Sequence, residues 1–368
     1  MIFHKTPPRI PARGELAGQL INTTVDSEVA KYYLEQYLQD RRNNPDLDLI
    51  INQAHMGDSG AIPSRDYLKY LSQRISPDFA ALYLAKKILE DSANMSIYRT
   101  FEEELARARI DVKTGEYRLD PAFRSYIILF VPGWVYKSEP ESGADFAKPR
   151  AIITRYGVEN HLIQIEETGT IEENADYIAE ELIRVNRMER EIILVSASSG
   201  GASASLALGK LLGPSDLKNV KAWVNIGGLL QGSFLADASI RWPNRWVTKI
   251  ILFFRNWDYD SIESMTIERS RERFREIKLP GETFCVNYVG IPLSGNITKR
   301  GKGGYLSARA EGPNDGMTLL VDALMPDCLT IPMLGIDHYF GQEMDVKTIA
   351  LSRTVMRYLK PKSAGGQY

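Results

Sequence analysis

The sequence predicts an α/β fold, in which a mostly parallel central sheet is flanked by helices. From residue 125 onward, short apolar segments rich in β-branched and aromatic residues alternate with longer segments of helical periodicity. In addition, the apolar run 191–197 stops at the small residues 198–201, which is typical of a strand that turns sharply into a helix. Parallel strands joined by crossover helices gather the loops after their carboxyl ends at one edge of the sheet.

The N-terminal part, residues 1–110, is expected to form a helical extension outside this sheet. Ser76 and Pro77 resemble an N-cap followed by proline at the first helical position. The segment 78–90 then carries apolar residues at helical spacing, and 95–108 is expected to form another helix. The many tyrosines of this region are interpreted as helix packing, with a substrate entrance as the alternative.

The α/β core is expected in two parts, residues 111–237 and 281–368. The pattern predicts strands at 125–131, 161–166, 191–197, 220–226, 283–291 and 329–335. It predicts helices at 143–156, 171–188, 202–212 and 317–324.

Residues 238–280 separate two predicted strands by more than a crossover requires, and they are expected to form a cap or lid insertion. The insertion contains a run of large apolar residues: Trp242, Trp246, Val247, Ile250, Ile251, Leu252, Phe253, Phe254 and Trp257. A charged, helix-like segment follows at 264–278. Two interpretations stay open, an apolar lid over a binding pocket and plain packing against the rest of the domain.

The sharp turn around Ser198 has the pattern small-x-Ser-x-Gly-Gly. Small residues stand where a tight strand-to-helix turn excludes large side chains, so the Ser198 hydroxyl would lie above the sheet at the positive end of a helix. A segment rich in Gly and Ser after a strand can also cradle a phosphate. Here the chain resembles the α/β-hydrolase superfamily, whose nucleophile motif is usually Gly-x-Ser-x-Gly; this sequence has Ser196, also small, at the first position.

The resemblance also points to a histidine base. The superfamily supplies its triad in the order Ser, Asp or Glu, His. Of the four histidines, His4, His55 and His161 all precede Ser198, so His338 is the candidate that fits this order. The alternative is a partly buried structural histidine packed beside its aromatic neighbours.

Asp315 is the expected acid of this triad. It lies in the segment 312–316, Gly-Pro-Asn-Asp-Gly, and resembles the Asp-Gly step that many lipases and esterases place in this region. An ordinary Asx turn is the alternative. Asp237 and Asp337 are rival acids, and Asp337 is expected to anchor the histidine loop instead.

The resemblance further implies an oxyanion hole made by two backbone N–H groups. One is expected from Ser199, directly after the nucleophile, and the other from Trp134, after the strand 125–131. The family often has His-Gly at this place, whereas this chain has Pro132-Gly133. Trp134 could instead be a wall of the acyl pocket.

The composition is that of a soluble globular protein, and it gives no sign of a nucleic-acid partner. The 368 residues are 44% hydrophobic and 25% charged, and 45 basic side chains balance 47 acidic ones. The first ten residues lack the apolar core of a signal peptide, and no run reaches membrane-spanning length, so a cytoplasmic protein is expected. Peripheral membrane contact through the Trp-rich insertion lacks the support of a basic face.

The two cysteines, Cys285 and Cys328, lie on or beside predicted strands and are expected to be buried thiols in a reducing compartment. No Cys/His spacing or acidic cluster suggests a metal, and the implied chemistry needs no cofactor.

The resemblance therefore implies a serine hydrolase that cleaves a carboxylic ester through an acyl-enzyme, in the manner of an esterase or lipase, with a small-molecule or lipid-like ester as substrate. Amidases, peptidases, thioesterases and acyltransferases can use the same triad. A non-catalytic binding or scaffold protein of the same fold is the alternative of a different class. The sequence gives no indication of the oligomeric state.

Overall fold

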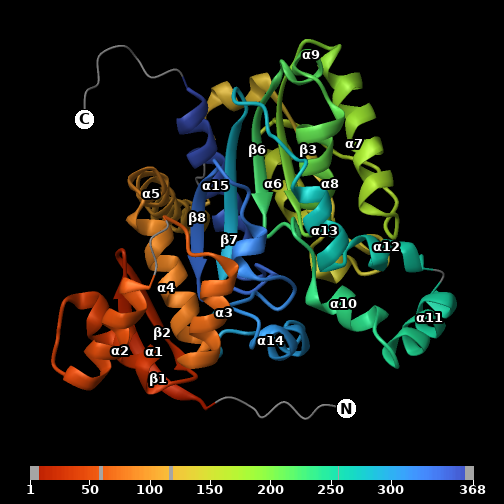
Figure 1. Ribbon diagram of the computed structural model, residues 1–368. Coiled ribbons are helices and arrows are strands. Elements are labelled where there is room, and N and C mark those ends of the chain that lie inside the picture. The colour runs from red at the N-terminus through yellow and green to blue at the C-terminus, as the bar shows by residue number, and fades with distance from the viewer. Residues whose placement is uncertain (1–7, 58–60, 116–118, 256, 361–368) are drawn as a thin grey trace.

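A computed structural model describes residues 8–57, 61–115, 119–255 and 257–360. The first ten residues were interpreted as lacking a signal peptide, and most of them, residues 1–7, lie outside the described residues. Six parallel strands form the central sheet in the order β4-β3-β5-β6-β7-β8 (Figure 1), which confirms the predicted α/β class. They are β3 (Tyr126–Val131), β4 (Glu159–Leu162), β5 (Glu191–Ala197), β6 (Val220–Ile226), β7 (Phe284–Ile291) and β8 (Leu329–Leu334).

The strand expected at 161–166 begins earlier and is shorter, as β4. Its ladder follows β3, with Phe130 paired to Leu162 and the Ile163 N–H donating to the Phe130 carbonyl at 2.8 Å. Strand β3 itself ends at Val131, one residue after Phe130, and the β3–β4 ladder ends with it.

Helices cover both faces of the sheet, because successive strand residues point to opposite sides. On one face, helices α6 (Ala147–Arg155) and α15 (Met344–Leu359) share a core with Ile128, Phe130 and Tyr288. On the other face, α7 (Ile171–Asn186), α8 (Ser199–Leu206) and α9 (Pro214–Leu217) pack against the alternate side chains, such as Leu129 and Leu194.

The N-terminal region contains helices from residue 28 onward, and it begins with a β-hairpin that the expected helical extension over residues 1–110 did not include. Strands β1 (Ile10–Leu16) and β2 (Gln19–Val25) are antiparallel and are joined by Ala17 and Gly18, both at positive φ. Such a two-residue turn matches the twist of a hairpin. The helices are α1 (Glu28–Glu35), α2 (Pro45–Met56), α3 (Arg65–Arg74), α4 (Pro77–Glu90) and α5 (Ser92–Thr114).

The predicted start of α4 is confirmed. The Ser76 side chain accepts a hydrogen bond from the Phe79 N–H, and Pro77 occupies the first turn. Ser76 thereby satisfies one of the N–H groups that a helix start leaves without an intrahelical partner.

The N-terminal helices cover the edge strand β8. Helix α5 packs on both β8 and α15, and the Asn94 side chain accepts a hydrogen bond from the Thr330 N–H at 2.7 Å in the buried interface. At a second junction, buried Asp78 accepts from the backbone N–H and the hydroxyl of Ser294, at 2.8 and 2.6 Å. The N-terminal region and one face of the sheet therefore share a single hydrophobic core.

The insertion between β6 and β7 is helical, and it follows α10 (Phe234–Ile240). It contains α11 (Asn244–Arg255), α12 (Tyr259–Ser264) and α13 (Ile267–Phe274). Figure 1 shows α11 at the periphery, away from the sheet. Within the ranges that the structure describes, no helix is both long and apolar enough to cross a bilayer.

Cys285 and Cys328 form a disulfide, which corrects the expectation of two free thiols. Strands β7 and β8 pair Val286 with Leu329, so the residues just before them face each other, with their Cα atoms 4.8 Å apart. Neighbouring strands thus bring together two cysteines that are 43 residues apart in sequence.

We expect reduction of this disulfide to lower the free energy of unfolding by about 2–4 kcal/mol, because the open loop regains conformational freedom in the unfolded chain. Urea unfolding with and without dithiothreitol measures the effect. A Cys285→Ala/Cys328→Ala variant is the control, since its midpoint should not respond to reductant. Equal midpoints for the oxidised and reduced wild type would contradict the expectation.

Candidate active site

Ser198 occupies a sharp turn between β5 and α8. Its backbone has φ 54° and ψ −129°, a conformation that residues with a side chain rarely adopt. Two glycines permit the close packing around it. A Cβ atom at Gly200 would lie 2.3 Å from the Pro132 carbonyl oxygen, and one at Gly201 would lie 2.8 Å from the Asn225 side-chain oxygen. The small residues of the motif are therefore required by the backbone, as the sequence pattern predicts.

Ser196, which stands where the usual motif has glycine, has a partner of its own. It is fully buried, and its hydroxyl accepts a hydrogen bond from the Trp223 indole N–H at 2.8 Å. The substitution therefore satisfies the buried indole donor of the neighbouring strand β6.

The structure brings Ser198, His338 and Asp315 into one chain of hydrogen bonds. His338 Nε2 lies 3.1 Å from Ser198 Oγ, and His338 Nδ1 lies 2.7 Å from Asp315 Oδ2. The His338 side chain is 8% exposed and Asp315 is fully buried. Ser198 follows β5, whereas Asp315 and His338 belong to the loops after β7 and β8, so all three gather at the carboxyl edge of the sheet.

Asp315 is held by the turn that it forms. Its Oδ1 accepts hydrogen bonds from the backbone N–H groups of Met317 and Thr318, both at 2.9 Å. The His338 N–H also donates to the Asp315 carbonyl, at 3.0 Å. Asp315 thus forms an Asx turn through Oδ1 and contacts the histidine through Oδ2, so the two alternatives for this residue are both present.

The helix expected at 317–324 is not formed, and only the four-residue 3₁₀ turn Leu320–Ala323 is present. The Asp315 side chain takes the first N–H groups of this segment, and Asn314 pairs with Leu319 in an isolated bridge. These contacts fold the segment back on itself, which positions the carboxylate but leaves no room for a regular helix.

The two rival acids have other partners. Asp337 accepts from the N–H groups of Thr298, at 2.8 Å, and Tyr339, at 3.2 Å, and so ties down the histidine loop. Asp237 lies in α10 and accepts from the Ile267 N–H at 2.9 Å. Among the described residues, neither carboxylate forms a hydrogen bond with the His338 ring.

The other histidines that the structure describes lie elsewhere. His55 packs among tyrosines of the N-terminal region, where burial, with a smaller contribution from Lys86, lowers the pKa of His55 to about 4. His161 lies on the edge strand β4, with its Nε2 3.1 Å from a Glu159 carboxylate oxygen.

Opposing effects act on the pKa of His338. Burial alone would lower this pKa, but the charge of Asp315, its hydrogen bond and the charge of Asp337 together raise it above its ordinary value. The surroundings of His338 therefore favour the protonated, positively charged imidazole ring.

The loop after β3 lies directly against Ser198. A Cβ atom at Gly133 would be 3.2 Å from the Ser198 Cβ, and Trp134 and Ser198 line the same cavity. The amides on both sides of Trp134 are engaged, since Gly133 donates to Ala144 and Val135 donates to Glu167. Among the residues described, the N–H groups of Trp134 and Ser199 have no hydrogen-bond acceptor. Trp134 and Ser199 thus belong to the two segments that meet at Ser198.

The Trp134 side chain points away from this loop to the insertion. Its indole N–H donates to Ser261 Oγ at 3.2 Å, and its ring packs edge-on against Trp257 at a centroid distance of 5.1 Å. The insertion thereby fixes the loop that carries the Trp134 amide.

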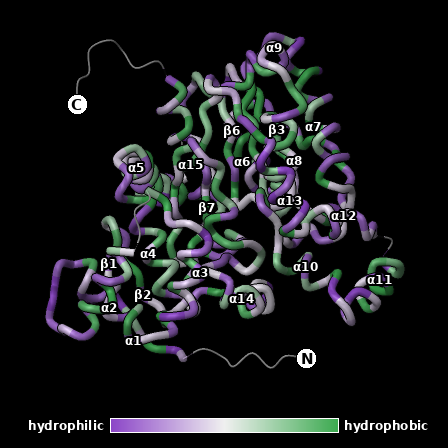
Figure 2. The backbone as a smooth tube through the Cα atoms, viewed as in Figure 1, coloured by the Kyte–Doolittle hydropathy of each residue, from purple (hydrophilic) through white to green (hydrophobic). Residues whose placement is uncertain are grey.

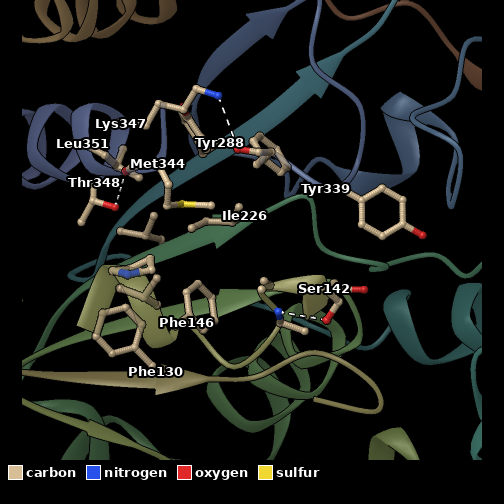
Figure 3. Close-up of a pocket in the computed structure, with 18 of the residues that line it drawn as sticks. Phe130, Ser142, Phe146, Ile226, Tyr288, Tyr339, Met344, Lys347, Thr348 and Leu351 are labelled. Atoms are coloured by element: carbon tan, nitrogen blue, oxygen red, sulfur yellow. Dashed lines mark hydrogen bonds between the residues drawn. The ribbon is translucent and has the colours of Figure 1, made fainter. Parts of the chain in front are cut away.

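A cavity of about 360 Å³ leads from Ser198 along one face of the sheet. Figure 3 shows Phe130 of the sheet across the cavity from Met344, Thr348 and Leu351 of α15, with Ile226 and Tyr288 beside Met344. Of the lining residues, Glu139, Arg300 and Tyr339 are partly exposed and mark the mouth. Phe123, Ile153 and Val355 are buried, and Phe123 precedes β3, at the end of the strand away from Ser198. Its volume and mostly apolar walls are typical of small-molecule sites.

The insertion does not line this cavity: among the described residues of 238–280, none contributes to its wall. The helices α6 and α15 do so instead, on the side of the sheet that they cover. The insertion instead contacts the Trp134 loop from outside, through Ser261 and Trp257.

Two buried polar groups interrupt the apolar wall, and the sequence analysis singled out neither. The Tyr288 hydroxyl is buried and has no hydrogen-bond partner within the described ranges. The Lys347 ammonium donates one long hydrogen bond, 3.4 Å, to the Phe340 carbonyl. Burial, with a contribution from Arg109 and against the charge of Glu343, lowers the pKa of Lys347 to about 8. Two sequence signals could have placed these residues on the cavity wall: the alternation of side chains between the two faces of β7, for Tyr288, and the helical spacing of apolar residues in α15, for Lys347.

We expect Lys347→Met to stabilise the protein at pH 7 by about 1–3 kcal/mol, because it removes a buried charge that folding disfavours. The pKa is about 8 in the folded chain and 10.5 in the unfolded one. The penalty is therefore complete below pH 8 and is relieved as the pH rises toward 10.5. Urea midpoints of both proteins at pH 7 and 10 measure this difference.

The exposed Lys148 on α6 offers a matched control, and Lys148→Met should change stability by less than about 0.5 kcal/mol at either pH. A gain for Lys347→Met that is the same at pH 7 and pH 10 would show that packing, and not charge burial, is its cause.

The fold is similar to those of a solved esterase and a solved lipase. A metagenomic carboxyl esterase aligns with a TM-score of 0.52 and 17% identity, over 66% of this chain and 77% of the other. The Bacillus licheniformis lipase BlEst2 in its mature form aligns with a TM-score of 0.50 and 20% identity, over 67% of this chain and 95% of the other. No protein-family profile and no curated protein matches the chain. At these identities the likeness establishes a shared fold.

Proposed function

We propose that this chain, which has the α/β-hydrolase fold, is a serine hydrolase that cleaves carboxylic esters with an apolar acyl group. The observation that carries the proposal is the hydrogen-bonded series Ser198, His338 and Asp315 at the open end of an apolar cavity. Nucleophile, base and orienting acid are in contact, and the cavity offers the acyl group a place away from water.

In the first half of the reaction, Ser198 Oγ attacks the acyl carbon and His338 Nε2 takes the hydroxyl proton. Asp315 holds the Nδ1–H of the ring and stabilises the imidazolium that forms. The N–H groups of Ser199 and Trp134 donate to the oxyanion of the tetrahedral intermediate. Collapse breaks the bond to the leaving alkoxide, which leaves as the alcohol with the proton of His338.

In the second half, water attacks the acyl-enzyme. His338 removes a proton from the water, and the new tetrahedral intermediate uses the same two N–H donors. When it collapses, Ser198 regains its proton from His338 and the carboxylic acid leaves. No atom outside the ester, the water and these residues is needed.

The length of the cavity suggests the size of the acyl group. On β5 the lining extends from Ala197 to Ile193, four residues apart, which corresponds to roughly 13 Å, enough for an extended acyl chain of roughly ten carbons. The alcohol part would lie at the mouth, beside Arg300 and Tyr339. Esters, amides and thioesters differ only in the leaving group, which would lie at this mouth. The buried cavity would hold the same acyl chain in each case, so it does not distinguish among the three substrate classes.

A chain-length series of p-nitrophenyl esters tests this assignment, with Val355→Phe to shorten the cavity. We expect the wild type to prefer medium to long acyl chains. The variant should lose about 10- to 100-fold in kcat/KM for the decanoate and less than about twofold for the butyrate, because the added ring fills only the far end. Val112→Phe, which adds the same bulk on α5 outside the cavity, is the matched control.

Equal losses for butyrate and decanoate in Val355→Phe would contradict this use of the cavity. Labelling with a serine-directed phosphonate, followed by intact mass, is measured in parallel. One adduct at Ser198 without turnover of any ester would favour an amide, a thioester or a transferred acyl group. Failure to label would favour a non-catalytic binding protein.

A further inference from the structure

Helix α11 presents its apolar side to solvent. Trp246, Ile250 and Phe253 recur at helical spacing, and Val247, Ile251 and Phe254 lie beside them, so they form one apolar face. Phe253 is 81% exposed, Phe254 82%, and Trp242, just before the helix, 82%. Figure 2 shows α11 at the periphery, with part of the helix in the colour of hydrophobic residues. Contiguous exposure of this kind marks a surface that contacts something apolar.

The opposite side of α11 faces the protein. Leu252 is buried, while Arg245 and Lys249 lie over the ring of Tyr259 at 5.8 and 4.7 Å from its centroid. Arg255 stacks over Trp257 and forms an ion pair with Glu139 at 3.2 Å. The apolar face is therefore held outward by specific contacts on the polar side.

The charge of this segment differs from that of the whole chain. Residues 241–255 contain four basic side chains, Arg241, Arg245, Lys249 and Arg255, and no acidic one, whereas the net charge of the chain is −2. The helix gathers three of these cations on the side opposite the apolar face, a grouping that the sequence analysis did not recognise as a basic face. Tryptophan and phenylalanine on one side and Lys and Arg on the other are the composition of helices that lie in a membrane interface.

The helix ends beside the cavity mouth. Arg255 pairs with Glu139, which lines the mouth and also lies 3.8 Å from Arg300 on its rim. Trp257, two residues after the end of α11, packs on Trp134. A surface that receives the apolar face of α11 therefore lies next to the entrance of the cavity.

We propose that α11 docks on a lipid bilayer that contains anionic lipids, with its apolar side chains among the acyl chains and its cations near the headgroups. A second copy of the chain fits less well, because a symmetric contact would bring two sets of four cations together. On the bilayer, negatively charged headgroups complement the same cations, and the long side chains of Lys and Arg can reach them from the flanks of the helix.

Flotation with vesicles tests the proposal without any catalytic step, so its outcome is independent of the proposed ester hydrolysis. The probes are vesicles of phosphatidylcholine and of phosphatidylcholine mixed with phosphatidylglycerol. We expect the wild type to float with the mixed vesicles and more weakly with phosphatidylcholine. Phe253→Ser/Phe254→Ser should lower the partition coefficient about 100-fold, since two large apolar side chains no longer enter the bilayer.

Met56→Ser/Ile110→Ser is the matched control, because Met56 and Ile110 are exposed apolar residues of the N-terminal helices. It should bind vesicles like the wild type. Arg245→Gln/Lys249→Gln should lose the preference for anionic vesicles. Thermal melting shows that each variant is folded.

Equal flotation of the wild type and Phe253→Ser/Phe254→Ser would overturn the proposal, as would absence of flotation in the wild type. Sedimentation velocity covers the rival occupant. A wild-type dimer that Phe253→Ser/Phe254→Ser converts to a monomer, with no vesicle binding by either, would assign the face to a second copy of the chain.

Discussion

Ser198→Ala is expected to lower kcat/KM for the best p-nitrophenyl ester by about 10⁴- to 10⁶-fold, because it removes the atom that forms the acyl-enzyme. The effect should be on kcat, since the cavity that binds the acyl chain is unchanged. Initial rates over the chain-length series measure it, and phosphonate labelling should be abolished in the same variant. The substitution removes one hydroxyl from a turn whose backbone is set by its neighbours, so the fold should persist.

Ser205→Ala is the matched control for this variant. Ser205 is a buried serine of the same helix α8, and its hydroxyl donates to the Ala202 carbonyl at 2.7 Å. It does not line the cavity. Its loss should change kcat/KM by less than about threefold. If Ser198→Ala kept more than a few per cent of the wild-type rate, Ser198 would not be the nucleophile.

Asp315→Asn is expected to lower kcat by about 10³- to 10⁴-fold. An asparagine at this position has the same shape, and its oxygen can still accept from Met317 and Thr318. Its amide group, however, would donate toward His338 Nδ1, which favours the ring tautomer that carries its proton on Nε2. That tautomer cannot accept the proton of Ser198. The fold is kept while the base is disabled.

The pH dependence gives this variant a second readout. In the wild type, kcat/KM should fall on the acid side with an apparent pKa above 6.5, because Asp315 and Asp337 outweigh burial at His338. Without the Asp315 charge, burial has the greater influence, so the pKa of His338 should fall and the acid limb of the residual activity should move to lower pH. A limb that stays in place would contradict the assignment of Asp315.

Asp337→Asn is the matched control for Asp315→Asn. Its carboxylate is near His338 but bonds to the N–H groups of Thr298 and Tyr339. The control should shift the acid limb in the same direction by less and should keep most of kcat. A larger loss for Asp337→Asn than for Asp315→Asn would exchange the roles of the two acids.

Local signals in the sequence were sufficient for much of the fold. Ser76, Pro77 and the apolar spacing that follows predicted α4, because capping and periodicity act within a few residues. Strands β5 and β6 were likewise predicted from short apolar runs. The three side chains that the superfamily resemblance singled out, Ser198, Asp315 and His338, lie in contact. Their catalytic roles are the proposal that the variants above test.

Features that depend on distant segments could not be predicted in this way. Pairing of Cys285 with Cys328 requires β7 and β8 to be neighbours, and strand order has no local signature. The cavity wall depends on which helices cover which face of the sheet, so Lys347 looked like any lysine of a surface helix. The segment 317–324 has helical composition, but a buried aspartate requires its N–H groups.

The helices that cover β8 also determine which N-terminal truncations this protein can tolerate. A fragment that began after α5 would expose the backbone N–H of Thr330 and the apolar residues of β8 that α5 covers. We expect the free edge of β8 to pair with other chains, so that the fragment aggregates. Such a fragment would also lose the hydrogen bonds between Asp78 and Ser294. Ser294 lies in the same loop as Thr298, and the Thr298 N–H donates to Asp337, next to His338. We therefore expect that the first third of the chain cannot be removed as a separate module, and that any fragment or graft of the central sheet has to include α4 and α5.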